Sequence, residues 1–331
     1  MRQIKFGLYL PTGDFARARR VAQRAERQGF YSLSINDHLY SPMGERDPQL
    51  ESFTTLSAIA AITTRIRLAP AVVAMSFRNP ALLAKTASTL DCISNGRFIM
   101  GLGSGWQRTE YEAHGYRYPS TTERLDQLED GIQVLKAMWT QDEPTYQGRF
   151  FSIKNAYNNP RPVQKPYPPL MLGGSGPKLL EIAARHADIA LLTAPIYHDK
   201  DSVQDPTAAV KFTKAVLKRR IGQLRDLTRA AGRDPDSIEL ASLVFVRMAR
   251  DKSQADAMVR QSAAQMGFPS EEAVRNSPGL LIGTPDEVKR ELQSRIEEFG
   301  LTFFTAAIFG QEAYEMWVDE IMPAFQGKSE Q

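Results

Sequence analysis

The chain has 331 residues, of which 42% are hydrophobic and 24% are charged, and its formal net charge is +3. This composition excludes a disordered chain, and the acidic and basic residues interleave too evenly for the clustered basic surface of a nucleic-acid-binding protein. No apolar run approaches the roughly 20 residues that a transmembrane helix requires.

The start of the chain and its cysteine content favour a cytoplasmic protein. Met1 leads directly into a strand-like run, so we expect no secretory signal peptide. Cys92 is the one cysteine, which excludes an internal disulfide and a cysteine-cluster metal site. The four histidines lack the spacing of metal ligands, so no metal is predicted. We expect partners to be small molecules, with neither nucleic acid nor membrane among them.

Short apolar runs alternate with amphipathic segments along the whole chain. The predicted strands cover residues 4–10, 32–35, 66–74, 98–102, 170–172, 189–192, 238–248 and 303–308. Helical spacing predicts helices over residues 15–28, 52–63, 80–93, 120–139, 177–185, 208–231, 253–266 and 285–299, followed by a last helix that ends near Phe325. The nearly continuous apolar strands indicate a parallel sheet that is buried on both faces.

Eight strands, each followed by a helix, predict an α/β protein of the (β/α)8 TIM-barrel class, with one domain over residues 1–331. A doubly wound dinucleotide-binding sheet fits less well, because its glycine turn comes early and leads directly into a helix. Barrel enzymes place their sites on the loops that follow the strands. Segments longer than simple loops are predicted at residues 37–51, 106–119 and 144–169, with a further insertion near 194–235.

The fourth predicted strand runs into the alternating glycines Gly101, Gly103 and Gly105, after which come Trp106 and Tyr111. Glycine lets a backbone turn sharply and approach a flat ligand closely. The pattern therefore fits either a tight turn or a surface for a flat ring. The two aromatic side chains either stack on that ring or close the loop.

Polar residues also follow the second strand, where Asp37 and His38 would lie at the barrel mouth. Histidine is the side chain best suited to exchange a proton near neutral pH. The alternative is that Asp37 caps a loop and His38 packs. The third strand ends without polar residues around Ala71 and Val72, which fits either plain core or an apolar wall against a ring.

A second glycine-rich turn, Gly173, Gly174, Ser175 and Gly176, follows the fifth strand and immediately precedes a helix. Backbone N–H groups at a helix N-terminus form a cradle for anions. The turn therefore predicts a phosphate site, with an ordinary glycine-rich turn as the alternative. Elsewhere, we expect three charged residues to form a structural ion-pair set: Asp91, Arg97 and Arg124.

Together, these motifs resemble the luciferase-like monooxygenase superfamily, whose barrel enzymes use FMN or the deazaflavin F420. The resemblance spans nearly the whole chain. The matching segments are Phe6–Pro11, Asp37–Leu39, Asn79–Lys85, Leu90–Asp91, Gly96–Arg97, Gly101–Trp106 with Glu110–Tyr111, Arg161–Pro166, Leu172–Gly174 and Ile282–Glu287.

The resemblance implies a homodimer whose barrel mouths bind the cofactor ring. It places Asp37 and His38 beside the reactive face of the ring, and a non-prolyl cis peptide at about Ala71–Val72 behind it. The same resemblance places two groups of residues around the rest of the cofactor: Gly103, Gly105 and Trp106 along the ring or its side chain, and Gly173, Gly174, Ser175 and Gly176 at its phosphate.

The Asp-His strand end and the Gly-Ser-Gly-Trp segment look more like those of the F420-dependent members. Some F420-dependent dehydrogenases carry a glutamate after the fourth-strand glycines, where this chain has Trp106. We therefore expect hydride transfer between F420 and an unidentified, apolar small organic substrate. The alternatives are an FMN-dependent monooxygenase supplied by a flavin reductase, and a non-catalytic barrel that binds a cofactor or a phosphorylated ligand.

Overall fold

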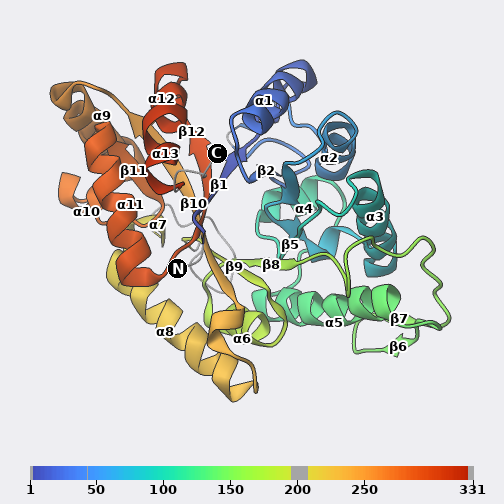
Figure 1. The fold of residues 1–331 in the computed structure, drawn as a ribbon. Helices are drawn as coiled ribbons and strands as arrows, with labels where there is room; N and C mark the ends of the chain where they lie inside the picture. Colours follow the sequence, from blue (N-terminus) through green and yellow to red (C-terminus); the bar gives the residue numbers. More distant parts are fainter. Residues whose placement is uncertain (1–2, 43, 195–207, 327–331) are drawn as a thin grey trace.

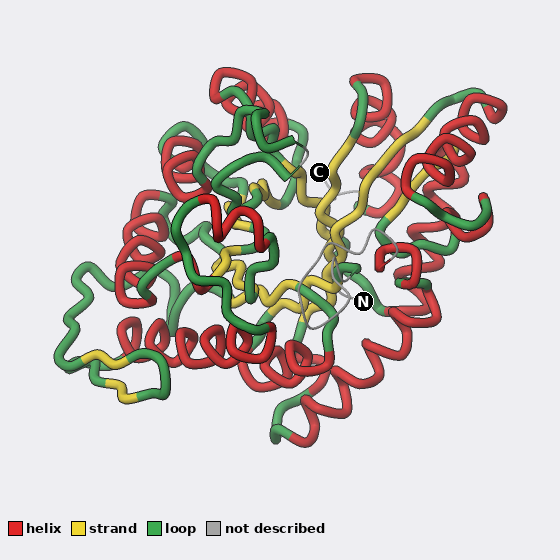
Figure 2. The backbone as a smooth tube through the Cα atoms, turned by 180° about the vertical axis from the view of Figure 1, so that it is seen from behind, coloured by secondary structure: helices red, strands yellow, loops and turns green. Residues whose placement is uncertain are grey.

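A ring of parallel strands forms the centre of the molecule, and helices surround it (Figure 1, Figure 2). The computed structural model describes residues 3–42, 44–194 and 208–326. In these ranges the ring consists of β1 (Lys5–Tyr9), β2 (Ser32–Ile35), β3 (Arg67–Pro70) with β4 (Val73–Ala74), β5 (Met100–Gly103), β8 (Leu170–Gly173), β9 (Ile189–Leu192), β10 (Glu239–Met248) and β12 (Phe303–Ile308). The predicted (β/α)8 barrel is confirmed.

The third strand of the barrel comes in two pieces, and each piece pairs with a different neighbour. β3 lies beside β2, and β4 lies beside β5. The cis peptide bond between Ala71 and Val72 lies between the pieces, where the family resemblance implied one. An isolated bridge between Leu68 and Phe98 joins the β3 edge to the segment before β5. The strand order β3-β2-β1-β12-β10-β9-β8-β5-β4 therefore closes on itself.

Gly101 allows the backbones of β3 and β5 to approach closely at this closure. A Cβ atom at Gly101 would overlap the carbonyl oxygen of Pro70. A side chain of any size therefore forces the two strands apart. The barrel interior beneath is filled by apolar side chains that point inward from the strands: Ala69, Ile99, Met171, Ile189, Leu191, Ala241 and Phe303.

The outer helices pack their apolar faces on the other side of the strands. They are α1 (Phe15–Arg27), α2 (Ser52–Ala60), α3 (Pro80–Ile93), α5 (Thr121–Thr140), α6 (Pro177–His186), α8 (Lys214–Ala230), α11 (Pro285–Phe299), α12 (Gln311–Met316) and α13 (Met322–Phe325). Shorter pieces are η1 (Met75–Phe77), η2 (Pro235–Ser237) and the π-helical η3 (Trp317–Ile321). Every described helix is too short or too polar to cross a membrane.

The predicted insertions carry small elements of their own. The segment 106–119 holds α4 (Arg108–Ala113), and 144–169 holds an antiparallel pair, β6 (Tyr146–Gln147) and β7 (Ser152–Ile153), beside α5 (Figure 1). Within 194–235, residues 195–207 lie outside the described residues, and α7 (Ala208–Lys211) precedes α8.

Neither β11 (Leu280–Gly283) nor the short helix α10 (Glu271–Arg275) was predicted, whereas α9 (Lys252–Met266) matches the helix predicted over residues 253–266. β11 pairs in parallel with β10 outside the ring, and α9 and α10 contact it. Its four residues form a run too short to distinguish from the approach to the next helix. β10 has ten residues and accepts this extra neighbour because its second half, Phe245–Met248, extends beyond its pairing with β9.

The expected ion-pair set of Asp91, Arg97 and Arg124 is wrong. The Arg97 guanidinium instead donates to backbone carbonyls, including those of Ala60 and Ile66 at 2.9 and 2.8 Å. Asp91 accepts from Gln164, and Arg124 donates to the carbonyl of Pro119. Buried carbonyl groups at chain turns need donors, and the guanidinium supplies several in one plane. All three side chains thus make structural contacts, but in the part of the chain that the structure describes no ion pair joins Asp91, Arg97 and Arg124.

Substituting Gly101→Ala is expected to lower the free energy of unfolding by at least about 3 kcal/mol, because the new Cβ overlaps the Pro70 carbonyl. Chemical denaturation measures the change. The matched control is Gly222→Ala within α8, where a Cβ meets nothing within 4 Å. That control should stabilise by up to about 1 kcal/mol. Equal stability of the two variants would contradict the proposed close approach.

Candidate active site

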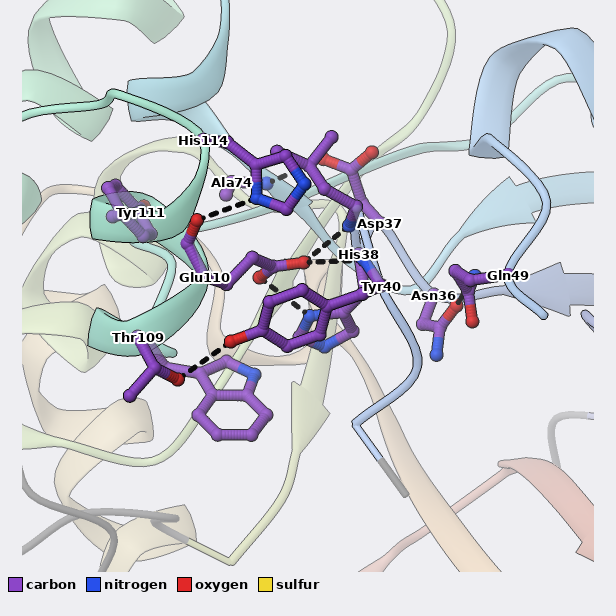
Figure 3. A network of polar contacts seen from close by, with 12 residues as sticks. Asn36, Asp37, His38, Tyr40, Gln49, Ala74, Thr109, Glu110, Tyr111 and His114 are labelled. Atoms are coloured by element: carbon purple, nitrogen blue, oxygen red, sulfur yellow. Dashed lines mark hydrogen bonds and ion pairs between the residues drawn. The ribbon is translucent and has the colours of Figure 1, made fainter. Parts of the chain in front are cut away.

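Side chains from the ends of β2 and β5 meet at one end of the barrel. Asn36, Asp37 and His38 follow β2 directly, and α4 follows β5 after a short turn. Because parallel strands point the same way, their carboxyl ends bring these segments together. Figure 3 shows the polar contacts that result, with the carboxylate of Glu110 at their centre.

His38 and Glu110 form the central pair of this site. The His38 Nδ1 atom lies 3.0 Å from Glu110 Oε2, and the Glu110 side chain is 1% exposed. The other carboxylate oxygen accepts the backbone N–H groups of Leu39 and Tyr40. An ionised carboxylate only accepts hydrogen bonds, so Nδ1 carries the proton in this contact. Nε2 is then the ring nitrogen that is left to exchange a proton.

Trp106 lies against His38 at the same mouth. Their rings meet edge to face, with centroids 5.2 Å apart and an interplanar angle of 80°. The Trp106 carbonyl accepts the hydroxyl of Tyr118 at 2.7 Å, which ties the loop after β5 to the segment before α5. The structure thus brings together two of the predicted site residues with a third, Glu110, to which the sequence assigned no role.

Asp37 is held in an ion pair. Its carboxylate oxygens lie 2.6 and 2.7 Å from the guanidinium of Arg78, and the backbone N–H of Ala74 donates to it at 3.1 Å. Arg78 also donates to Glu51 at 3.0 Å. Asp37 therefore ties the end of β2 to the backbone that follows the cis peptide.

Val72 fills the top of the barrel interior between two of the predicted glycines. A Cβ at Gly103 would lie 2.6 Å from one Val72 methyl group, and a Cβ at Gly173 would lie 2.7 Å from the other. Both glycines are therefore needed to make room for Val72. The Tyr9 hydroxyl reaches the Ala71 carbonyl at 3.4 Å from below, and burial, with Asp37 nearby, raises the pKa of Tyr9. These residues form a floor at the mouth.

Tyr111 does not offer a ring face to a ligand. Its side chain is fully buried, its hydroxyl lies 2.9 Å from Ser76 Oγ, and burial raises its pKa to about 12. A Cβ at Gly105, which has a φ of 74°, would overlap the Tyr111 hydroxyl. Of the two alternatives for Tyr111, its burial favours closure of the loop, where Gly105 leaves the space that the Tyr111 hydroxyl fills.

The second glycine turn leads into α6 with its backbone open. Gly174 uses its N–H on the Leu191 carbonyl, and the Ser175 hydroxyl donates to the Thr193 carbonyl at 2.7 Å. Gly176 is the N-cap without a side-chain cap, and a Cβ there would meet nothing within 4 Å. Lys178 pairs with Asp126. The first-turn N–H groups of α6 remain as the part of this turn that suits an anion.

Sequence reasoning missed the roles of Glu110 and Arg78. Glu110 is separated from His38 by 72 residues, and Arg78 from Asp37 by 41. No local spacing connects pairs this distant. Among the residues that the structure describes, no cluster of three or more histidine, cysteine or acidic side chains is arranged to hold a metal ion.

Comparison with known proteins places the chain in a family. Residues 3–302 match the sequence profile described as luciferase-like monooxygenase. The pyrimidine monooxygenase RutA of Bradyrhizobium sp. is 29% identical over 84% of this chain and 76% of its own length. An F420-dependent glucose-6-phosphate dehydrogenase of Kineococcus radiotolerans is 31% identical over 58% of this chain and 57% of that protein.

The fold is shared with solved structures. An F420-dependent secondary alcohol dehydrogenase in complex with an F420-acetone adduct superposes with a TM-score of 0.78 over 97% of both chains, at 20% sequence identity. The profile match covers most of the chain, and the relatives include F420-dependent enzymes and monooxygenases. The chain therefore belongs to the luciferase-like monooxygenase family of oxidoreductases, as its motifs predicted.

Proposed function

We propose that this protein transfers a hydride between coenzyme F420, bound at the barrel mouth, and a small apolar organic substrate. The observation that carries the proposal is the His38–Glu110 pair beside Trp106, which places an oriented proton carrier against the indole ring. Reduction of a carbonyl or an activated double bond consumes one hydride and one proton, so such a site needs a proton donor as well as the cofactor.

The residues present fit a flat cofactor with an anionic tail. Ala71 and Val72 would support the ring from below, and His38 and Trp106 would border it. The open first turn of α6 at Gly176 would hold a phosphate, since no side chain caps it. When bound, F420 supplies or accepts the hydride, and the protein supplies orientation and the exclusion of water.

His38 would hold and transfer the proton through Nε2. Glu110 fixes the ring with Nδ1 as the donor, so Nε2 would be the atom that meets the developing charge on a substrate oxygen or carbon. Trp106 would exclude water from that exchange. Asp37 acts at a distance, because Arg78 and the Ala74 N–H hold its carboxylate and with it the turn that carries His38.

FMN-dependent monooxygenation is the second candidate. The match to a pyrimidine monooxygenase over 84% of this chain favours it. Ala71 and Val72 below the ring, with His38 and Trp106 beside it, would then exclude water from a reduced flavin. The two candidates differ in the cofactor that the chain prefers, so cofactor binding separates them.

Titration of the purified chain with F420 and with FMN, followed by fluorescence, should give micromolar affinity for F420 and at least tenfold weaker affinity for FMN. The two rings have similar size, so the preference arises from the contacts around them. A preference for FMN would transfer the protein to the second candidate, and oxygen consumption would become the next assay.

His38→Ala should lower turnover roughly 100-fold while F420 affinity and unfolding stay close to wild type, because only the proton carrier is lost. Turnover is the oxidation of reduced F420 by menadione, which takes up a hydride and a proton. The matched control is His114→Ala, since His114 bonds to the Glu110 carbonyl rather than to its carboxylate. Wild-type turnover in His38→Ala would remove His38 from the mechanism.

Glu110→Gln should also lower turnover, by roughly 100-fold, with little change in the KM for menadione. The single amide oxygen is taken by the N–H groups of Leu39 and Tyr40, so the amide nitrogen faces His38 and reverses the ring's tautomer. Nitrogen NMR of labelled histidine reports that reversal directly. An unchanged tautomer with full turnover would show that Glu110 is merely structural.

A further inference from the structure

Two large aromatic side chains remain exposed at the barrel mouth. Phe245 lies on β10 and is 42% exposed, and Phe309 directly follows β12 and is 53% exposed. Their rings stack, with centroids 6.2 Å apart and an interplanar angle of 25°. Burying a phenylalanine side chain stabilises by about 1.5–3 kcal/mol, so a stacked pair left open is a surface that gains from being covered.

Strand alternation shows which face of β10 carries Phe245. Successive side chains of a strand point to opposite faces. Ala241 lies in the apolar cluster of the barrel interior with Leu243 packed against it, and Phe245 follows at the same two-residue interval. The intervening Val244 and Val246 are buried in the outer core. Phe245 therefore points to the inner side of the barrel.

The same alternation applies to β12. Phe303 belongs to the interior cluster, so Thr305, Ala307 and Phe309 follow on that face. The register pairs Phe245 with Ala307, and the Phe309 N–H donates to the Val246 carbonyl at 3.0 Å. Neighbouring strands thus place both rings side by side above the interior cluster.

Four inward-facing residues form an apolar surface that we call the aromatic wall: Leu243, Phe245, Ala307 and Phe309. It lies at the same end of the ring as the candidate active site: β12 pairs with β1, and β1 pairs with β2, whose end carries His38. Arg247 comes next on this face of β10, but its guanidinium is bonded to Ser262 and Gln261 of α9. The wall itself carries no charged side chain.

The position of the wall limits what covers it. Its side chains stand on the inward face of β10 and β12, directly above the packed interior cluster, so they border the space over the barrel axis, where barrels of this size hold one small ligand. Aromatic rings prefer offset or edge contacts with other rings, which adds to the gain from buried area. We propose that the aromatic wall binds a planar, uncharged, aromatic or conjugated part of the substrate, and so sets specificity. This rests on the proposed function in taking the wall's ligand as the substrate of that site.

The test is calorimetric binding of 2-naphthol, a planar probe, and of cyclohexanol, a non-planar one, to the full chain without cofactor. Wild type should bind 2-naphthol more tightly. Phe245→Ala and Phe309→Ala should each weaken that binding about tenfold. Phe309→Leu, which keeps apolar volume without a ring, should lie between. Leaving out the cofactor makes the result independent of whether F420 or FMN is used.

The matched control is Tyr157→Ala, an aromatic residue that is 58% exposed in the segment 144–169, outside the barrel. It should bind 2-naphthol as wild type does. The proposal is overturned if wild type does not bind 2-naphthol, if the phenylalanine variants bind it unchanged, or if the control weakens equally. A change in sedimentation of the phenylalanine variants with unchanged probe binding would assign the wall to a contact between copies of the chain.

Discussion

The close approach of β5 to the end of β3 is the constraint on which the site depends. Gly101 permits it by leaving the Pro70 carbonyl free of any side chain. Because β3 pairs with β2 while β4 pairs with β5, this region carries the ring from one side of the site to the other. The end of β2 and the turn after β5 are thereby brought within hydrogen-bonding reach, although the chain separates them widely.

Charge burial organises what this closure brings together. Glu110 is almost fully buried, and a buried carboxylate is costly unless donors surround it. The donors come from the turn after β2: the His38 ring and two backbone N–H groups. Asp37, one residue earlier, is satisfied separately by Arg78. The turn is thus fixed before the histidine by the Asp37–Arg78 ion pair and after it by the two N–H groups that bond to Glu110, which gives the imidazole a defined orientation before any ligand arrives.

The sequence was informative wherever a local pattern sufficed. Apolar runs bounded by amphipathic segments predicted every strand of the ring, and the end of the second run placed Asp37 and His38 at the carboxyl end of β2, where the structure has them. β11 escaped because four apolar residues before a helix look the same paired or unpaired. Spacing alone also left open what each glycine accommodates: Gly103 makes room for Val72, and Gly105 for a buried tyrosine. For a related reason, the sequence predicted the wrong partners for Arg97 and no role for Glu110. Their partners are backbone groups and distant side chains, which no periodicity reveals.

Val72 gives the mouth a single point of adjustment. One side chain occupies the space that two glycines leave on neighbouring strands, so the height of the floor at the mouth is set by the side-chain volume at position 72 and not by the backbone. Shortening that residue would lower the floor by about the size of its methyl groups without moving any strand. A lineage evolving from this barrel would thus accept thicker or thinner ligands through one codon, because the two glycines leave their space to whatever side chain stands at position 72.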